Sequence, residues 1–447
     1  MEPIVTEKGS RYILDWPSQQ VRMEVGRIKP SLKAEVKTFF QESPFIRSYP
    51  VLDSNSGLDI FWKKLNRRKP IKDYGVDWEA CVEEMAGVVI DRQRKHTPTV
   101  LIKDVREEEG IQWRVDNIMV EDITLIFGDG GSGKSMMACL LASMMDSGYM
   151  STDHNLVCEP GRVLYLDWET KNPDNPGAEI AKRINSILRG FGREPESHVV
   201  YQEMGSPLNE ELDFVIDLID EHDIDVVIID SMGLSLGGDL EAAEPVLQWF
   251  RDVGSLNKPT LIVSHKNKAG GIFGSQYTYN SCRMVWEARK SDTGVANGVD
   301  MVMFHRKANN VPQQHAIAWH IAFEDDTIIF SRKDVMDTEE SGELKIPELI
   351  YRFIVQGPIK REDLDDLIAD RKGIAPDTKA FSRMRNAIST AISRKVKSNE
   401  IEVDNNVLKL PADKIKKGEV FYEGGTSMPL AELQEQTGEK EWEQLRI

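Results

Sequence analysis

Hydrophobic residues in the middle of the chain form short continuous runs, separated by segments with a different periodicity. The runs cover residues 123–127, 163–167, 226–230 and 260–264. A run that is apolar at nearly every position is typical of a strand buried on both faces of a sheet. Between the runs, apolar residues recur every three or four positions, which predicts amphipathic helices. The alternation over residues 120–333 therefore predicts an α/β domain in which helices wrap a parallel sheet. The positions that indicate the helices are Ile180, Ile184, Ile187, Leu188 and Phe191, then Leu212, Val215, Leu218 and Ile219, then Val246, Leu247, Phe250 and Val253.

The first part of the chain has the two-residue period of a half-exposed antiparallel sheet. Apolar and charged residues alternate within residues 21–28 and 32–39, and another strand-like run covers residues 11–16. Prolines lie between these runs, where a strand would be interrupted. The pattern predicts a small β-rich module over residues 1–74.

A basic run and a helix connect this module to the α/β domain. The run, Trp62 to Lys69, combines several lysines and arginines with a tryptophan. It is interpreted either as a contact to a phosphate backbone or as an ordinary solvated face. An amphipathic helix is predicted at 77–94, within a helical connection that covers 75–119.

The last part of the chain predicts a second small domain after a polar linker at 334–343. Three amphipathic segments and a strand pair, with Asn405 and Asn406 at its turn, occupy residues 344–412. Three helices followed by a hairpin predict a winged helix-turn-helix domain. Residues 371–397 contain eight Lys or Arg and a single acid. This local excess indicates DNA contact, and the alternative is a winged helix that serves oligomerisation or protein docking.

The composition limits what this architecture can bind. The chain has 447 residues, enough for two or three domains, and a formal net charge of -18. A negative total argues against a protein that coats nucleic acid, so local basic patches must carry any such binding. Residues 413–447 are predicted to form an acidic tail. The absence of a membrane-length apolar run and of a secretory signal pattern leads us to expect a cytoplasmic protein that does not bind membranes. The four cysteines have the spacing of neither a zinc site nor a disulfide framework.

The candidate chemistry is concentrated in a glycine-rich loop that follows the run at 123–127. The loop matches the pattern G-x-x-x-x-G-K-[ST] and precedes a segment of good helix formers. Glycines allow successive backbone N–H groups to converge on phosphate oxygens, and the helix directs its positive dipole end at the same anion. Lys134 supplies charge to the β- and γ-phosphates of ATP, and the Ser135 hydroxyl is a ligand for Mg²⁺. The residues expected to bind the nucleotide are Gly128, Asp129, Gly130, Gly131, Ser132, Gly133, Lys134, Ser135 and His265.

Polar residues follow three of the predicted strands, at the edge where parallel sheets bind ligands. Asp230 is expected to be the carboxylate that holds the same Mg²⁺ ion through water. Glu169 is expected to take a proton from the attacking water or to orient it, and its alternative role is a helix-capping acid. His265 lies where it could sense the γ-phosphate and pass the signal to the glycine-rich segment 267–280. That segment, with Lys268, is interpreted as a nucleic-acid-binding loop or as a plain surface loop.

Basic residues further along the chain are candidates for action in trans. Arg283 and the cluster His305, Arg306 and Lys307 could reach the nucleotide of a neighbouring subunit. An arginine supplied in trans stabilises the charge of a transferring phosphoryl group. The alternative for a single arginine is a salt bridge within its own chain.

Residues 120–333 resemble a RecA-like ATPase of the RepA/DnaB helicase branch, also described as an AAA-family ATPase. By that resemblance Glu169 is the catalytic glutamate, Asp230 the Walker B aspartate and His265 the switch residue. The resemblance also implies that Arg283 or Lys307 is a finger that reaches the adjacent subunit. The motifs that carry it are Gly128 to Ser135, Leu164 to Thr170, Asp230 to Leu234, and His265 with Gly274 and Ser275.

The combined expectation is a Mg-ATP-hydrolysing motor that works on DNA as a ring or filament. Single strands would pass the core loops, and duplex DNA would contact the winged helix. The leading role is a replication helicase of a phage, plasmid or mobile element. Two alternatives stay open: a recombination or repair ATPase that does not unwind DNA, and an ATP-gated winged-helix regulator.

Overall fold

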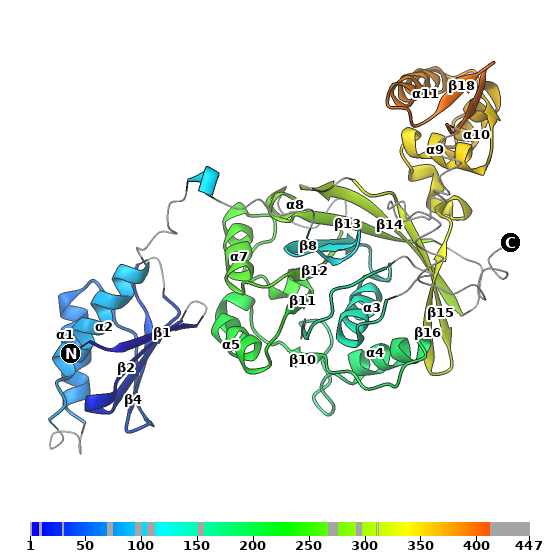
Figure 1. Cartoon of the computed structure of the whole chain (residues 1–447). Helices are drawn as coiled ribbons and strands as arrows, with labels where there is room; N and C mark the ends of the chain where they lie inside the picture. Colours follow the sequence, from blue (N-terminus) through cyan, green and yellow to red (C-terminus); the bar gives the residue numbers. More distant parts are fainter. Residues whose placement is uncertain are drawn as a thin grey trace.

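The protein, analysed as a computed structural model, consists of an N-terminal module, a central sheet flanked by helices, and a C-terminal module (Figure 1). The predicted acidic tail 413–447, most of the segment 267–280 with Lys268, and much of the connection after residue 93 lie outside the described residues. The structure describes residues 2–8, 11–28, 31–68, 75–93, 101–104, 112–150, 156–266, 276–291, 297–309, 311 and 313–411.

The N-terminal module is a five-stranded antiparallel sheet in the order β1-β2-β3-β4-β5, with two helices packed on it. Alternate residues of β2 face the helices, so Leu14 and Trp16 are buried together with Met85 of α2. The strands predicted at 11–16, 21–28 and 32–39 form as β2, β3 and β4, and the helix predicted at 77–94 forms as α2. Strands β1 and β5 had not been predicted. The elements are β1 (Ile4–Lys8), β2 (Arg11–Trp16), β3 (Val21–Gly26), β4 (Glu35–Phe40), β5 (Ser43–Ser48), α1 (Asn55–Asn66) and α2 (Trp78–Gln93).

The basic run at 62–69 begins inside helix α1 and continues past its end. Lys63 forms an ion pair with Asp59 one turn earlier, and Arg68 donates to the carbonyl of Phe45. Lys64 is exposed. Part of the run therefore stabilises its own module, and phosphate binding by the run stays a prediction.

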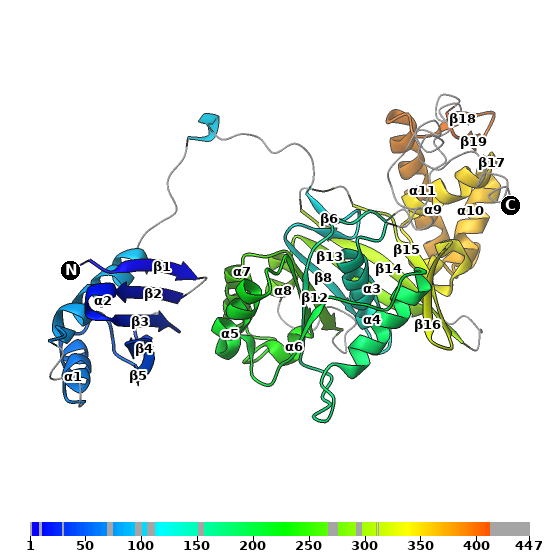
Figure 2. The ribbon, with the colours of Figure 1, turned by 60° about the horizontal axis from the view of Figure 1, so that its bottom comes forward.

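The N-terminal module lies against helix α5 of the central domain, as Figures 1 and 2 both show. Arg11 of β2 forms ion pairs with Asp213 and Asp217, at 3.6 and 3.0 Å. Lys8 pairs with Asp220 at 3.7 Å. The contact is therefore ionic, between a basic edge of the module and an acidic face of α5.

The central sheet has nine strands in the order β10-β9-β11-β12-β8-β13-β14-β15-β16. The first six are parallel to one another, and the strands of the runs at 123–127, 163–167, 226–230 and 260–264 are all among them. The strands are β8 (Ile123–Gly128), β9 (Val163–Asp167), β10 (Val200–Glu203), β11 (Val226–Asp230), β12 (Thr260–His265), β13 (Met284–Ser291), β14 (Gly298–Ala308), β15 (Ile317–Glu324) and β16 (Thr327–Lys333). A short hairpin, β6 (Trp113–Val115) and β7 (Met119–Val120), precedes β8.

Helices cover both faces of the sheet, which explains why its strands are apolar throughout. Successive side chains of a strand point to opposite faces. Ile126 accordingly packs with α3 and α4, whereas Leu125 and Phe127 pack with α5, α6 and α7. The helices are α3 (Lys134–Ser147), α4 (Ala178–Gly190), α5 (Leu208–Glu221), α6 (Met232–Ser235), α7 (Ala243–Ser255) and α8 (Gln276–Ser281).

The expectation of a purely parallel sheet is corrected by the last three strands. β14, β15 and β16 are antiparallel to their neighbours and extend the sheet beyond β13. The central residues of β14 and β15 are buried on both faces: Met301 of β14 belongs to the core under α3, and Val302 to the core of the C-terminal module, whereas β16 exposes Ile329. An apolar run of this kind gives no indication of strand direction.

The C-terminal module contains three helices and a three-stranded sheet in the order β17-β19-β18. Asn405 and Asn406 both have positive φ, so the hairpin turn forms where it was predicted. Interpretation of these elements as a winged helix-turn-helix domain stays a prediction. The elements are α9 (Ile346–Gln356), β17 (Ile359–Lys360), α10 (Arg361–Arg371), α11 (Lys379–Lys397), β18 (Glu402–Asp404) and β19 (Val407–Lys409).

The segment 334–343, predicted as a polar linker, packs tightly between the central and C-terminal parts. It forms two 3-10 turns, η4 (Val335–Asp337) and η5 (Glu339–Glu343), and Val335 and Met336 are buried in the core of the C-terminal module. Phe304 of β14 belongs to the same core. The C-terminal module is thus joined to the sheet by apolar contacts.

Candidate active site

The glycine-rich loop connects the buried strand β8 to the first turn of α3. Lys134 is the first residue of that helix, and Gly133 caps it with φ of 88°. Gly131 also has positive φ, which side chains disfavour. At Gly128 a Cβ atom would lie 2.2 Å from the carbonyl oxygen of Ala288, so only glycine fits. The local structure is therefore the strand, loop and helix that a phosphate site requires.

Lys134 lies inside this loop and is only 4% exposed. Its Nζ donates to the carbonyl oxygen of Asp129 at 2.7 Å. Burial lowers the pKa of Lys134, while the nearby carboxylates of Asp230 and Glu169 oppose that change. The ammonium thus occupies the position in which phosphate oxygens would replace the loop carbonyl as its partners.

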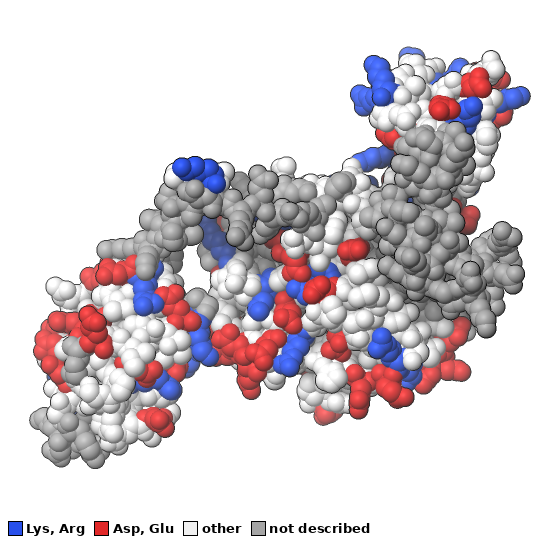
Figure 3. Space-filling view, viewed as in Figure 1, with Lys and Arg blue, Asp and Glu red and all other residues white. Residues whose placement is uncertain are grey.

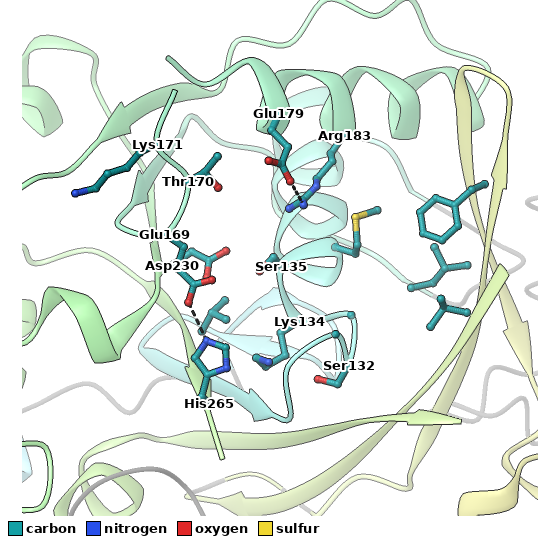
Figure 4. A pocket seen from close by; sticks show the side chains of 17 residues that line it. Ser132, Lys134, Ser135, Glu169, Thr170, Lys171, Glu179, Arg183, Asp230 and His265 are labelled. Carbon is teal, nitrogen blue, oxygen red and sulfur yellow. Dashed lines mark hydrogen bonds and ion pairs between the residues drawn. The ribbon is translucent and has the colours of Figure 1, made fainter. Parts of the chain in front are cut away.

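Asp230 ends strand β11 and is buried beside Ser135 (Figure 4). Its Oδ2 accepts a hydrogen bond from the Tyr165 hydroxyl at 2.7 Å, and its Oδ1 is buried with no hydrogen-bond partner among the described residues. Burial raises the pKa of Asp230, although the hydroxyls of Tyr165 and Ser135 stabilise its charged form. A buried carboxylate oxygen without a partner, next to a serine hydroxyl, fits a hydrated Mg²⁺ ion.

Glu169 and His265 meet across the same edge of the sheet. The Oε1 atom of Glu169 lies 2.8 Å from Nε2 of His265. Asp167 accepts from the backbone N–H groups of Glu169 and Thr170, at 2.8 and 3.0 Å, and so fixes the turn that carries Glu169. Burial would raise the pKa of Glu169, but the hydrogen bond with His265 and the nearby charge of Lys134 help to outweigh it and lower the pKa. Glu169 is therefore ionised at neutral pH, as a base must be.

The strand order explains how residues far apart in sequence converge. β12 lies between β8 and β11, and its last residue, His265, is paired with Gly128 of the loop strand. Asp230 is paired with Asp167, so β9 and β11 end at the same level. The structure thus brings together all the predicted residues from Gly128 to Ser135 with Glu169, Asp230 and His265.

Three polar residues of the site had not been predicted to act there. Tyr165 orients Asp230, as described, and Tyr201 of β10 donates to Oδ2 of Asp167 at 3.2 Å. Asp167 itself is 1% exposed. The sequence did contain a signal for two of them: a tyrosine and an aspartate stand inside the otherwise apolar run at 163–167. Because a buried polar side chain needs a hydrogen-bond partner, such residues indicate a polar network.

A second charged cluster adjoins the loop on its other side. Glu287 of β13 forms ion pairs with Lys266 and Arg289, both at 2.7 Å, and with Arg306 at 2.5 Å. Burial opposes ionisation of Glu287, yet these cations lower its pKa to about 2. Lys266 also pairs with Asp129 at 3.3 Å. The cluster therefore ties the phosphate loop to β13 and β14.

The two candidate fingers are engaged elsewhere in their own chain. Arg283 precedes β13 and pairs with Asp122 at 3.0 Å, at the end of β8 opposite the loop. Lys307 donates to the carbonyl oxygens of Tyr279, Asn280 and Cys282 at 2.6 to 2.8 Å, which occupies all three donors of its ammonium. Neither lines the pocket of its own subunit. Action on a neighbouring subunit stays a prediction, and the structure gives Lys307 the role of capping α8.

The end of the phosphate loop, with Glu169, Asp230 and His265, lines a cavity of about 610 Å³, a volume suited to a small-molecule ligand. One side carries Thr170 and Lys171 after β9, and the Glu179–Arg183 ion pair of α4 lies above the loop (Figure 4). Among the described residues no cluster of three His, Cys, Asp or Glu side chains forms a metal site. An ion here would accordingly be held by few protein ligands together with phosphate oxygens, as Mg²⁺ is in nucleotide sites.

One of the comparisons with known proteins, a family match, agrees with this geometry. A protein-family model described as an AAA domain matches residues 91–271, which is less than half of the chain. The chain is also similar to the structure of a KaiC-like protein from the hyperthermophilic archaeon Pyrococcus horikoshii, with 11% identity, 47% of this chain and 90% of that chain covered, and a TM-score of 0.34. A TM-score this low supports no conclusion about this chain. A search of curated proteins found no match.

The loop geometry and the AAA-domain match over residues 91–271 both point to a P-loop nucleotide site. The nucleotide implied is ATP, usually with Mg²⁺, and the buried residues around Lys134 and Asp230 fit both. No helix in the described ranges is long and apolar enough to cross a membrane. The four cysteines are buried and form no disulfide with one another.

Proposed function

We propose that this protein is a motor that hydrolyses Mg-ATP and acts on DNA, as a replication helicase similar to the RepA/DnaB branch. A phage, plasmid or mobile element is the proposed setting. The observation that carries the DNA part is the exposed face of helix α11, described below. The hydrolytic part rests on the contact between Glu169 and His265 beside a buried phosphate loop.

In the proposed reaction, Glu169 accepts the proton of the attacking water or holds that water in line. Lys134 and the N–H groups of the loop would offset the charge that develops on the phosphates. Ser135 and Asp230 would hold Mg²⁺, which supplies Lewis-acid stabilisation of the phosphate oxygens. Because His265 contacts Glu169, movement of His265 toward a phosphate would release the carboxylate for catalysis.

Helix α11 presents an acid-free polar face on the side opposite its core. The helix contains six Lys or Arg and no Asp or Glu. Its buried residues, such as Ile388 and Ile392, form one stripe, and a basic and polar stripe with helical spacing lies opposite. Among the residues that the structure describes, Arg383, Arg394 and Lys397 have no acidic partner. The exposed stripe consists of Lys379, Arg383, Asn386, Thr390, Arg394 and Lys397.

The charge distribution favours α11 over other surfaces as a duplex contact. The neighbouring hairpin carries Glu402 and Asp404, which pair with Lys409 and leave no basic excess there. Figure 3 shows Lys and Arg around the outer edge of the C-terminal module with some acidic side chains among them, whereas acidic side chains are frequent along the side of the core that carries α4 and α5. A helix with arginines, asparagine and threonine on one face offers donors to phosphates and to base edges.

The α11 face is tested by charge reversal. We expect the double variant Arg383→Glu, Arg394→Glu to reduce duplex affinity at least tenfold, measured by fluorescence anisotropy with labelled DNA, and to leave DNA-free ATPase turnover unchanged. The matched control is Lys33→Glu, Arg251→Glu, which changes the net charge equally at exposed sites elsewhere. An equal loss of duplex affinity in both variants would mean that only total charge matters. If neither variant lost affinity, α11 would not be part of the DNA contact.

Measurements on the same purified protein distinguish two other functions. A recombination or repair ATPase would show DNA-stimulated hydrolysis without directional unwinding of a forked substrate. An ATP-gated regulator, which the α11 face also fits, would bind one duplex sequence tightly through the C-terminal module and hydrolyse ATP independently of DNA.

A further inference from the structure

The pocket has a hydrolytic end and an apolar end. Glu169 and His265 define the first, and they contact each other at 2.8 Å. The apolar end is lined by Val299 of β14 and by Ile321 and Phe323 of β15. Figure 4 shows the labelled catalytic side chains on one side of Lys134 and Ser132 on the other, toward the antiparallel strands.

The sheet register makes these three apolar residues a single wall. Val299 is directly opposite Ile321 in the antiparallel pair of β14 and β15. Phe323 is two positions from Ile321 and therefore points to the same face. A Cβ atom on Gly133 would lie 3.7 Å from the Cδ1 atom of Ile321, so the wall begins beside the last residue of the phosphate loop.

The direction of a bound nucleotide follows from these positions. The γ-phosphate must lie near Glu169 for hydrolysis, and the remaining phosphates lie over the loop and the start of α3. The nucleoside then leaves the loop away from Glu169, which is the side where the pocket wall is apolar. Pockets for such ligands combine apolar walls with a few polar groups.

Phe323 is the member of the wall that has an accessible face. Its side chain is 41% exposed, whereas Ile321 is 1% exposed and serves the core. An exposed aromatic ring at the end of a polar pocket loses contact with water when a base stacks on it. Stacking between a base and an aromatic side chain is worth about 1–3 kcal/mol per base, a range of about 5- to 150-fold in affinity.

We propose that Val299, Ile321 and Phe323 form the nucleobase site, in which the Phe323 ring stacks on the base of the bound nucleoside triphosphate. This inference rests on the proposed ATP site and adds the part of the ligand that the phosphate loop does not recognise. Phe323 is a binding residue: it contacts the base and takes no part in phosphoryl transfer.

The test compares ATP with inorganic tripolyphosphate, which has the phosphates but no base. Binding of each, with Mg²⁺, is measured by calorimetry on the full chain. We expect Phe323→Ala to weaken ATP binding about tenfold or more and to leave tripolyphosphate binding within twofold. Phe323→Tyr keeps the ring and retains ATP affinity, while Phe323→Leu keeps apolar bulk and loses affinity.

The control is Phe214→Ala, since Phe214 of α5 is 40% exposed and lies outside the pocket. It should change neither affinity, and thermal unfolding of each variant reports whether it is folded. Unchanged ATP binding in Phe323→Ala and Phe323→Leu, or equal weakening of both ligands, would overturn the proposed base site. Failure of the unmodified protein to bind either ligand would instead contradict the phosphate site itself, and the base site with it.

Discussion

Glu287 offers a sharp test of the electrostatics around the phosphate loop. The substitution Glu287→Gln keeps the shape of the side chain and removes its charge. Three cations, from Lys266, Arg289 and Arg306, then surround a neutral group at a position that is 5% exposed. Removal of one partner from a buried ion cluster is destabilising because the remaining charges lose their compensation.

The magnitude follows from the pKa of Glu287. The difference between its ordinary value of 4.5 and about 2 in the folded protein corresponds to roughly 3 kcal/mol of stability. Two of the three cationic partners, Arg289 and Arg306, are about a quarter exposed to solvent, which reduces the effect. We expect Glu287→Gln to lower the free energy of unfolding by about 2 kcal/mol at pH 7.

The stability difference between Glu287→Gln and the unmodified protein should shrink as the pH falls. Since folding lowers the pKa of Glu287, its contribution is complete above the unfolded pKa of about 4.5 and is lost as the pH falls toward 2. Urea unfolding, followed by circular dichroism at pH 7 and at several values below 4.5, should show the two proteins converging. Glu241→Gln, at an exposed position, is the matched control. Equal stability of Glu287→Gln and the unmodified protein at pH 7, or a difference that does not shrink on acidification, would refute the reasoning.

Two further predictions concern contacts outside the pocket. Arg11→Glu should release the N-terminal module from α5, because Asp213 and Asp217 would repel the new charge. The measurement is the rate of proteolysis between the module and the central domain, which should rise in this variant and fall again when Asp217→Arg is added to the same chain. An unchanged cleavage rate would contradict the ionic contact. Lys307→Met should lower stability by about 1–2 kcal/mol, since two carbonyls of α8 and the carbonyl of Cys282 just after it lose a charged donor. That loss should appear as a lower melting temperature without nucleotide, and loss of ATPase turnover at full stability would instead favour the trans-acting role.

The sequence was sufficient for four of the six parallel strands and for most of the pocket. Continuous apolar runs located β8, β9, β11 and β12, and the glycine pattern located the loop that starts α3. Asp230, Glu169 and His265 were identified because each ends or closely follows a buried strand, and parallel strands bring such residues to one edge. These predictions depend on local patterns with a known geometric consequence.

The remaining features depend on pairings that no local pattern specifies. The antiparallel direction of β14–β16 is not encoded in apolar runs, so the Val299 and Phe323 wall could not be foreseen. Lys307 looked like a finger because it is a basic residue in a suitable region, whereas its contacts to α8 arise only in the folded chain. The polar segment 334–343 contains Val335 and Met336, and only tertiary packing shows that they are buried.

The most direct test of the proposed DNA-dependent motor is the steady-state ATPase rate with no DNA, with single strands and with duplex. It is measured on the unmodified protein and on Glu169→Gln, with mass photometry of the same samples. We expect single strands to stimulate turnover, an oligomer to form with ATP, and the variant to lose turnover by about 100-fold or more while it still binds ATP. A monomer or dimer whose ATPase rate does not change with DNA would contradict the proposal of a DNA-dependent motor. Full activity of Glu169→Gln would contradict the assignment of Glu169 as the catalytic base.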